Sequence, residues 1–189
     1  MKSLASLALL FAVSATVALA ATETWTVDPV HTTAQFTARH FGIVPVVGTI
    51  PVKKAVVKLQ AGSQIPIEVS AELDPASVDT HNGMRDNDIR SGHYFDVGSY
   101  PNMTFQSTKI TGTDPKHFTI YGDLTMHGQT HPVALSAGVV GAGTSPRGRS
   151  IIAYAATGTI DRTQWGMSFG PIIVGNSIDI SLNVEADGP

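Results

Sequence analysis

Apolar and polar side chains alternate with a period of two along much of this chain, and no other feature constrains the fold as strongly. Phe36 has an alanine two residues away on each side, and the positions between them are threonine or glutamine. Successive side chains of a strand point to opposite faces, so this alternation predicts a strand that is buried on one side. The pattern recurs in residues 65–73, 118–126, 133–139 and 178–184, and less regular strands are expected at 25–27, 48–60, 103–110 and 151–160. About eight such strands must hide their apolar face and their edges, as a barrel or a two-sheet sandwich does.

The alternation breaks between residues 79 and 96, where the sequence predicts a short helix and a loop. Thr80 or Asn82 suits the helix N-cap, and a carboxylate at Asp86 suits the first turn, where the helix dipole favours negative charge. The segment carries mixed charges at Arg85, Asp86, Asp88, Arg90 and Asp96. Carboxylates beside arginines could serve acid–base catalysis, but ion pairs that fix a loop are the favoured interpretation. We expect a helical insertion packed on or over the mouth of a barrel.

The first twenty residues have the pattern of a secretory signal peptide. Lys2 precedes an apolar stretch from Leu4 to Leu19, which ends in the small-x-small sequence Ala18-Leu19-Ala20. A membrane anchor is the rival interpretation, but the stretch is short for a bilayer span and no stop-transfer charges follow it. Residues 1–20 are therefore expected to be removed near Ala20, leaving one domain over residues 21–189 in the periplasm or outside the cell.

Composition excludes several classes of function. The chain has no cysteine, so disulfides, thiolate metal sites and cysteine catalysis are all excluded. Its formal net charge is −3, which gives no electrostatic reason to bind nucleic acid. The sequence also lacks the Gly-x-Ser-x-Gly elbow, the phosphate-binding glycine-rich loop and the metalloprotease helix motif, so no enzyme of a common class is indicated.

The histidines raise the question of a metal site. There are seven, and no two have the i, i+2 spacing that would put both on one strand face. His127 and His131 flank a turn and could meet across it, but three or four converging ligands are needed for zinc or copper, and surface histidines are the simpler interpretation. His40 continues the series of alternate positions Ala34, Phe36 and Ala38, which are otherwise apolar, so its side chain should point inward. There it could be a hydrogen-bonded core residue or a polar contact to a ligand.

The inward positions favour a cavity over a filled core. Many are small: Ala34, Ala38, Ala71, Gly122, Ala137, Ala153 and Ala155. Aromatic residues at inward parity, among them Phe36, Phe105 and Phe118, would line the wall. A barrel of about eight strands can be filled by its own side chains or can hold one ligand, and small lining residues leave room for the ligand.

Motifs in a fixed order resemble those of the YceI-like family. They are Trp25 to His31, Phe36, Arg39-His40, Val47-Gly48, Asp79-Thr80, Arg85-Asp86, Tyr100 to Phe105, Gly122 to Thr125 and Asp161 to Met167. The resemblance implies an all-β fold, an extended lipocalin-like antiparallel barrel that holds a long isoprenoid chain in the periplasm and is not catalytic. The chain departs from the family at His131, where Lys or Arg is usual after the turn threonine. If that position faced a ligand head group, binding would become pH-dependent; a surface change is the simpler interpretation.

These observations lead to a specific functional hypothesis. The ligand-binding residues are expected to be Phe36, His40, Phe105, Ile120, Leu124, Met126, Trp165 and Phe169, with Trp165 and Phe169 near an opening. The ligand would be an isoprenoid or another amphipathic lipid, with no further cofactor or metal, with transient membrane contact, and with a homodimer left open. Two alternatives remain: an enzyme that acts on a bound lipid or quinone through His40 or the Arg85–Asp88 cluster, and a periplasmic metal-binding or stress-response module.

Overall fold

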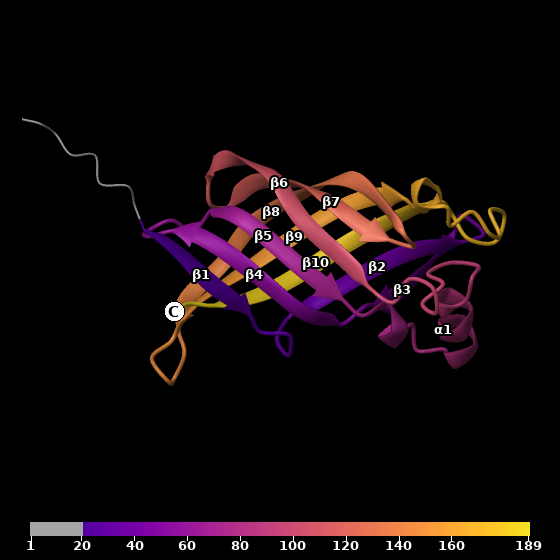
Figure 1. Ribbon diagram of the computed structural model, residues 1–189, viewed down its shortest axis with the longest axis horizontal. Helices are drawn as coiled ribbons and strands as arrows, with labels where there is room; N and C mark the ends of the chain where they lie inside the picture. Colours follow the sequence, from indigo (N-terminus) through magenta and orange to yellow (C-terminus); the bar gives the residue numbers. More distant parts are fainter. Residues whose placement is uncertain (1–20) are drawn as a thin grey trace, which may run out of the picture.

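The computed structural model describes residues 21–189, and the predicted signal peptide lies outside that range (Figure 1). More than half of the described chain is β-strand. The strands are β1 (Thr22–Val27), β2 (Thr33–His40), β3 (Val44–Thr49), β4 (Val52–Gln60), β5 (Pro66–Leu73), β6 (Met103–Asp114), β7 (His117–Met126), β8 (Gln129–Thr144), β9 (Ser150–Asp161) and β10 (Ser177–Asp187). One α-helix, α1 (Gly83–Arg90), and two 3-10 turns, Pro75–Ser77 and Arg162–Trp165, complete the described elements. No described helix is long and apolar enough to cross a membrane.

The strands form a closed antiparallel barrel. Neighbours run in the order β1-β4-β5-β6-β7-β8-β9-β10-β2-β3, and β1 also pairs with β10 through Thr26↔Asp187 and Val27↔Ala186. β1 and β2 pair one after the other with the same edge of β10, so together they act as one interrupted strand. β4 pairs with β1 and β3 pairs with β2, so β3 and β4 likewise act as one interrupted strand. The result is an eight-stranded barrel, which confirms the lipocalin-like prediction and rules out the sandwich.

The predicted alternation is confirmed where it was clearest. On β7, Phe118, Ile120, Leu124 and Met126 are buried, as is Gly122 at the same parity, while the alternate residues are intermediate or exposed. The interpretation fails on β9, where Ala153 and Ala155 were expected inside. There Ile152, Tyr154 and Ala156 are the buried residues. Both parities of β9 are apolar, so its sequence does not decide which face is inward.

Helix α1 forms as predicted and lies at the end of the barrel opposite the C-terminus (Figure 1). Asn82 is the N-cap, because its side-chain oxygen accepts the Arg85 amide at 3.1 Å. Thr80 has a different role: its amide and hydroxyl both donate to the Asp86 carboxylate, at 2.9 and 2.5 Å. These bonds fix α1 to the segment before it, and backbone hydrogen bonds between Asp79 and Thr49 join that segment to the end of β3.

Two separate clusters of buried side chains occupy the ends of the barrel. The cluster far from α1 includes Trp25, Leu59, Phe118 and Tyr154, and the last two pack edge to face at 6.4 Å. The Tyr154 hydroxyl donates to the Gln64 carbonyl at 3.0 Å, and burial raises the pKa of this phenol. The cluster near α1 is formed by Ile50, Val78, Phe95, Met103, Leu124, Met126, Trp165 and Met167. Members of both clusters also line an open space in the barrel interior.

Candidate functional site

A cavity of about 680 Å³ runs through the barrel and is lined by side chains of both clusters. Its lining includes both Phe118 and Met126 of β7, which are about 26 Å apart at ~3.3 Å per residue, or about 20 Å along the axis of a barrel with tilted strands. Dividing the 680 Å³ by this length gives a mean cross-section of roughly 35 Å². The cavity is therefore a narrow tunnel, whose volume lies within the usual range for ligand sites.

Seven of the eight expected binding residues line this tunnel: Phe36, His40, Phe105, Ile120, Leu124, Met126 and Phe169. The structure corrects the expected position of Trp165. Its side chain is completely buried behind the wall, where the indole N–H donates to the Leu124 carbonyl at 3.0 Å. Trp165 supports the tunnel from outside instead of lying at an opening.

Two glycines make room for aromatic rings that line the tunnel. A Cβ on Gly48 would overlap the Phe36 ring, and one on Gly122 would overlap the Phe105 ring. Each ring therefore lies over a glycine on the neighbouring strand. This packing keeps the rings against the wall and the middle of the tunnel open.

The tunnel is apolar in its interior and more polar at one end. Interior lining comes from side chains such as Val57, Val69, Ala71, Leu135 and Leu182. Polar groups gather at the α1 end, where His40, Asn82, Arg85 and Asp88 contribute, and Thr32, Thr33 and Gln35 add a second polar stretch at the start of β2. A molecule with an apolar tail and a polar head matches this distribution.

The mouth of the tunnel lies at the α1 end. Among the described lining residues, the exposed large apolar side chains are Met84 on α1, with Phe169 and Ile173 in the segment between β9 and β10. The opposite end is closed by the cluster around Trp25 and Tyr154. A ligand would therefore enter between α1 and the 168–175 segment.

Buried Arg162 holds the 168–175 side of the mouth in place. Its guanidinium donates to the carbonyls of Val174 and Gly175 at 2.8 and 3.0 Å, and also to the Met167 carbonyl. It lies 5.6 Å from the centre of the Tyr94 ring, on the α1 side, and burial lowers the pKa of this guanidinium. Arg162 therefore anchors this segment through its backbone carbonyls, and Tyr94 is a contact that the sequence analysis did not single out.

The charged residues of α1 are likewise used for anchoring. Arg85 donates to the Thr80 hydroxyl and carbonyl at 2.8 and 2.7 Å, and Asp86 accepts from the same threonine. The Thr80 hydroxyl, as the largest influence, lowers the pKa of Asp86. Arg90 reaches the Ala76 and Val78 carbonyls at 3.4 Å. The cluster fixes the loop as predicted, but through hydrogen bonds to Thr80 and to backbone carbonyls, since no Arg–Asp ion pair joins its members among the described residues.

Comparison with known proteins identifies the family. The model of the YceI-like domain matches residues 25–186, nearly the whole described barrel. The chain belongs to the YceI-like family. A relative from Pseudomonas savastanoi pv. phaseolicola, named only as a UPF0312 protein, is 31% identical and is aligned over 97% of this chain and 96% of its own length.

Solved structures of similar fold agree with the YceI-like assignment. Burkholderia cenocepacia BcnA superposes with a TM-score of 0.74 at 21% identity, covering 84% of this chain and 98% of BcnA. A polyisoprenoid binding domain from Saccharophagus degradans, implicated in plant cell wall breakdown, superposes with a TM-score of 0.60 at 11% identity, covering 91% of this chain and all of that domain. At these identities the two likenesses concern the fold alone.

The turn histidines of this YceI-like barrel pack around Trp165 and do not line the tunnel. His127 Nδ1 lies 2.7 Å from the Trp165 carbonyl oxygen, and the His131 ring meets the Trp165 ring edge to face at 5.1 Å. His131, which departs from the family pattern, therefore lies outside the cavity lining. Of the residues named for polar contact with a ligand, only His40 borders the tunnel.

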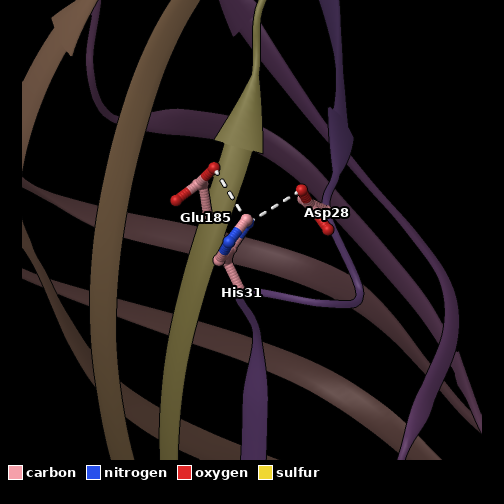
Figure 2. A group of neighbouring side chains, drawn as sticks. All are labelled: Asp28, His31 and Glu185. Carbon is pink, nitrogen blue, oxygen red and sulfur yellow. Dashed lines mark hydrogen bonds and ion pairs between the residues drawn. The ribbon is translucent and has the colours of Figure 1, made fainter. Parts of the chain in front are cut away.

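The described residues contain one cluster with three metal-ligand types, and the sequence did not indicate it. His31, between β1 and β2, points toward Asp28 and toward Glu185 on β10 (Figure 2). Its Nδ1 lies 3.0 Å from Asp28 Oδ2 and 3.6 Å from Glu185 Oε1. The Asp28 hydrogen bond raises the pKa of His31, while the Val30 amide and then His31 lower that of Asp28.

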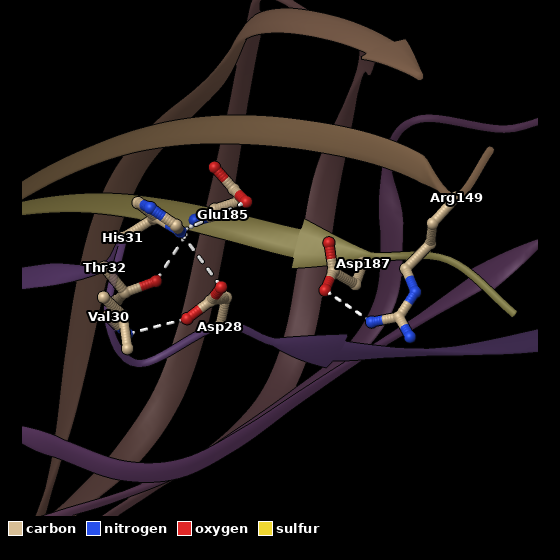
Figure 3. A network of polar contacts seen from close by, with 7 residues as sticks. All are labelled: Asp28, Val30, His31, Thr32, Arg149, Glu185 and Asp187. Carbon is tan, nitrogen blue, oxygen red and sulfur yellow. Dashed lines mark hydrogen bonds and ion pairs between the residues drawn. The ribbon is translucent and has the colours of Figure 1, made fainter. Parts of the chain in front are cut away.

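This cluster is best understood as a set of ion pairs that joins the connection between β1 and β2 to β10, where the YceI-like barrel closes. The ion pairs of His31 with Asp28 and Glu185 are called the clasp below. It lies on the outside of the barrel, where the His31 side chain is 63% exposed. Figure 3 shows the clasp beside a second ion pair, in which Arg149 donates to Asp187 at 2.8 Å. Both join β10 to its neighbours near the point where β1 gives way to β2. Asp28 and His31 are neighbours in the sequence, and the pairing of β10 with β1 and β2 brings Glu185 to them.

Proposed function

We propose that this protein is an exported lipid-binding protein that holds a long isoprenoid chain, of polyprenyl or quinone type, in its barrel as a carrier or reservoir. The observation that carries the proposal is the continuous apolar tunnel, which is closed at one end and has polar groups at its mouth. The similar fold of the Saccharophagus degradans polyisoprenoid binding domain supports the same ligand class. The signal-peptide pattern of residues 1–20 supports export to the periplasm or beyond.

The proposed roles follow from position along the tunnel. Phe36, Phe105, Ile120, Leu124 and Met126 would contact the isoprenoid tail, since all five side chains line the apolar interior. His40 would contact the head group near the mouth, and Phe169 would lie beside it. Catalysis is not part of the proposal, because Arg85, Asp86 and Arg90 already bind backbone and threonine groups and Asp88 pairs with His93.

The energetics suit exchange with a membrane. Burying one methylene from water is worth about 0.8 kcal/mol, so a long tail binds the tunnel strongly relative to water. A bilayer solvates the same tail about equally well, so transfer between bilayer and tunnel is nearly balanced. A near balance lets the protein both load and release its ligand.

Extraction of the purified protein with organic solvent, followed by mass spectrometry, tests the proposal. We expect a stoichiometric isoprenoid in protein taken from its native compartment. Ala156→Leu adds bulk inside the tunnel, and Ala155→Leu adds the same bulk on the outer face of the same strand. The first variant should lose the lipid and the second should keep it. An empty extract from correctly folded protein, together with no transfer of labelled isoprenoid between vesicles, would refute the carrier proposal.

A further inference from the structure

The mouth of the tunnel is surrounded by exposed apolar side chains. They come from three segments and are defined here as the apolar rim: Phe41, Ile43, Val44, Met84, Phe169, Ile172 and Ile173. Ile43 is 76% exposed, Met84 82% and Ile172 83%. Single exposed apolar residues are common on soluble proteins, but a group that encircles a cavity mouth indicates an interaction site.

The rim is held together as one surface. The β2–β3 turn is joined to the 168–175 segment by hydrogen bonds from the Phe41 amide to the Ile173 carbonyl and from the Gly175 amide to the Arg39 carbonyl, both 2.9 Å long. Phe169 in turn stacks on His93, beside α1, with ring centres 3.7 Å apart. The apolar tips therefore keep fixed positions relative to the mouth.

We infer that the apolar rim docks on the surface of a lipid bilayer and inserts its tips among the head groups, so that the tunnel mouth faces the source of its ligand. This inference rests on the proposed isoprenoid-binding function and adds the surface through which loading occurs. The rim residues at the β2–β3 turn protrude on a tight turn, with positive φ at Phe41 and Gly42, and so form narrow tips instead of a flat face. Narrow apolar tips suit insertion into a membrane interface better than pairing with a protein surface.

Charge supports the same occupant. Residues 39–47 and 166–176 contain Arg39 and His40 but no carboxylate, and α1 adds two arginines and two aspartates that balance each other. The chain as a whole has a formal net charge of −3. The β2–β3 turn and the 166–176 segment, which carry six of the seven rim residues, are thus neutral to positive while the chain as a whole is acidic, and an anionic membrane would attract these two segments more than the rest of the surface.

Ile43 and Ile172 allow docking to be separated from ligand binding, because both are exposed rim residues that do not line the tunnel. The test compares the natural protein with the double variant Ile43→Asp/Ile172→Asp. The matched control is Val140→Asp, which alters an apolar residue that is 67% exposed on β8, close to the β8–β9 hairpin and away from the mouth. Co-sedimentation with vesicles of phosphatidylcholine and phosphatidylglycerol measures docking, and calorimetric titration with farnesol measures tunnel binding.

We expect the double variant to lose about tenfold or more in vesicle partitioning while it binds farnesol like the natural protein, and the control to change neither. Arg39→Gln should weaken binding to anionic vesicles about fivefold and leave binding to neutral vesicles unchanged. Farnesol binding without vesicle binding by the natural protein would overturn docking and leave the lipid-binding proposal standing. Equal partitioning of the double variant and the natural protein would also overturn docking. Failure of every protein to bind farnesol would refute the proposed function itself.

Discussion

Replacing Gly48 with alanine should push the Phe36 ring away from the wall and into the tunnel. A Cβ at this position would lie 2.6 Å from Phe36 Cε1 and 2.7 Å from the Thr80 methyl carbon, far inside ordinary contact distance. Every close neighbour is a side-chain atom, so the clash can be relieved by moving the ring. Thr80 has less freedom because its hydroxyl is bonded to Asp86 at 2.5 Å.

The expected cost follows from the size of this overlap. Adding one methyl to a packed site costs about 1–3 kcal/mol, which for a chain of this length lowers Tm by about 2–12 °C. Thermal and urea unfolding of the lipid-free protein would measure that cost. Phe36→Leu removes the ring, so the Gly48→Ala/Phe36→Leu double variant should recover about 0.5–2 kcal/mol relative to the sum of the single variants. Gly48→Ala alone should also carry less extractable isoprenoid, because the displaced ring occupies tunnel volume.

Gly141→Ala serves as the matched control, since a Cβ there would meet no atom within 4 Å. Its Tm and lipid content should match those of the natural protein. The reasoning would be refuted if Gly48→Ala unfolded like this control. It would equally be refuted if Phe36→Leu cost the same free energy in the natural protein and in the Gly48→Ala variant, because the ring would then not pack on the glycine.

Three further predictions concern residues around the tunnel. Arg162→Lys should lower the free energy of unfolding by about 1.5–3 kcal/mol in urea titration. The reason is that a lysine ammonium cannot reach all the carbonyls that the buried guanidinium binds. An unchanged free energy of unfolding would disprove the anchoring role. Trp165→Phe should cost about 1–3 kcal/mol by the same measurement, since the Leu124 carbonyl loses its donor, and an unchanged midpoint would contradict this. Because the pKa of His31 is raised, its ion pair stabilises the fold fully below about pH 6.5, and this stabilisation is lost as pH rises through the folded-state pKa. Because the pKa of Asp28 is lowered, its carboxylate contributes stability above about pH 4. His31→Gln should therefore lower Tm most between about pH 4 and 6.5 and progressively less as pH rises through the folded-state pKa of His31, and a pH-independent difference would refute the clasp.

The fold could be predicted from the sequence wherever one strand face was polar. On β7, polar residues separate Phe118, Ile120 and Leu124, so parity identified the buried face. On β9 both faces are apolar, and its register is decided by pairing with β8 and β10, which depends on residues distant in the sequence. Alternation therefore predicts the buried face only for strands that have one apolar face and one polar face.

The site could be predicted only in part, for a related reason. The tunnel wall lies on strands, and its residues were identified by parity. The mouth is formed by a turn, a helix and the 168–175 segment, which have no periodicity, and their proximity depends on contacts such as the Phe41 amide with the Ile173 carbonyl. Trp165 is predicted near an opening, but its indole N–H donates to the Leu124 carbonyl in the buried wall instead.

The division of the core into two end clusters connects stability with function. Trp25 and its neighbours close one end, Trp165 and its neighbours brace the other, and neither cluster needs the middle of the barrel to be filled. An unfilled apolar space lacks the dispersion contacts that its lining would otherwise make, so a bound tail contributes contacts that the empty barrel does not have. Occupancy at one hundred times the dissociation constant would add about 2.7 kcal/mol to stability. Because a bilayer competes for the same tail on nearly equal terms, the isoprenoid content of the membrane, and not an intrinsic preference of the tunnel, should decide how often the barrel is full.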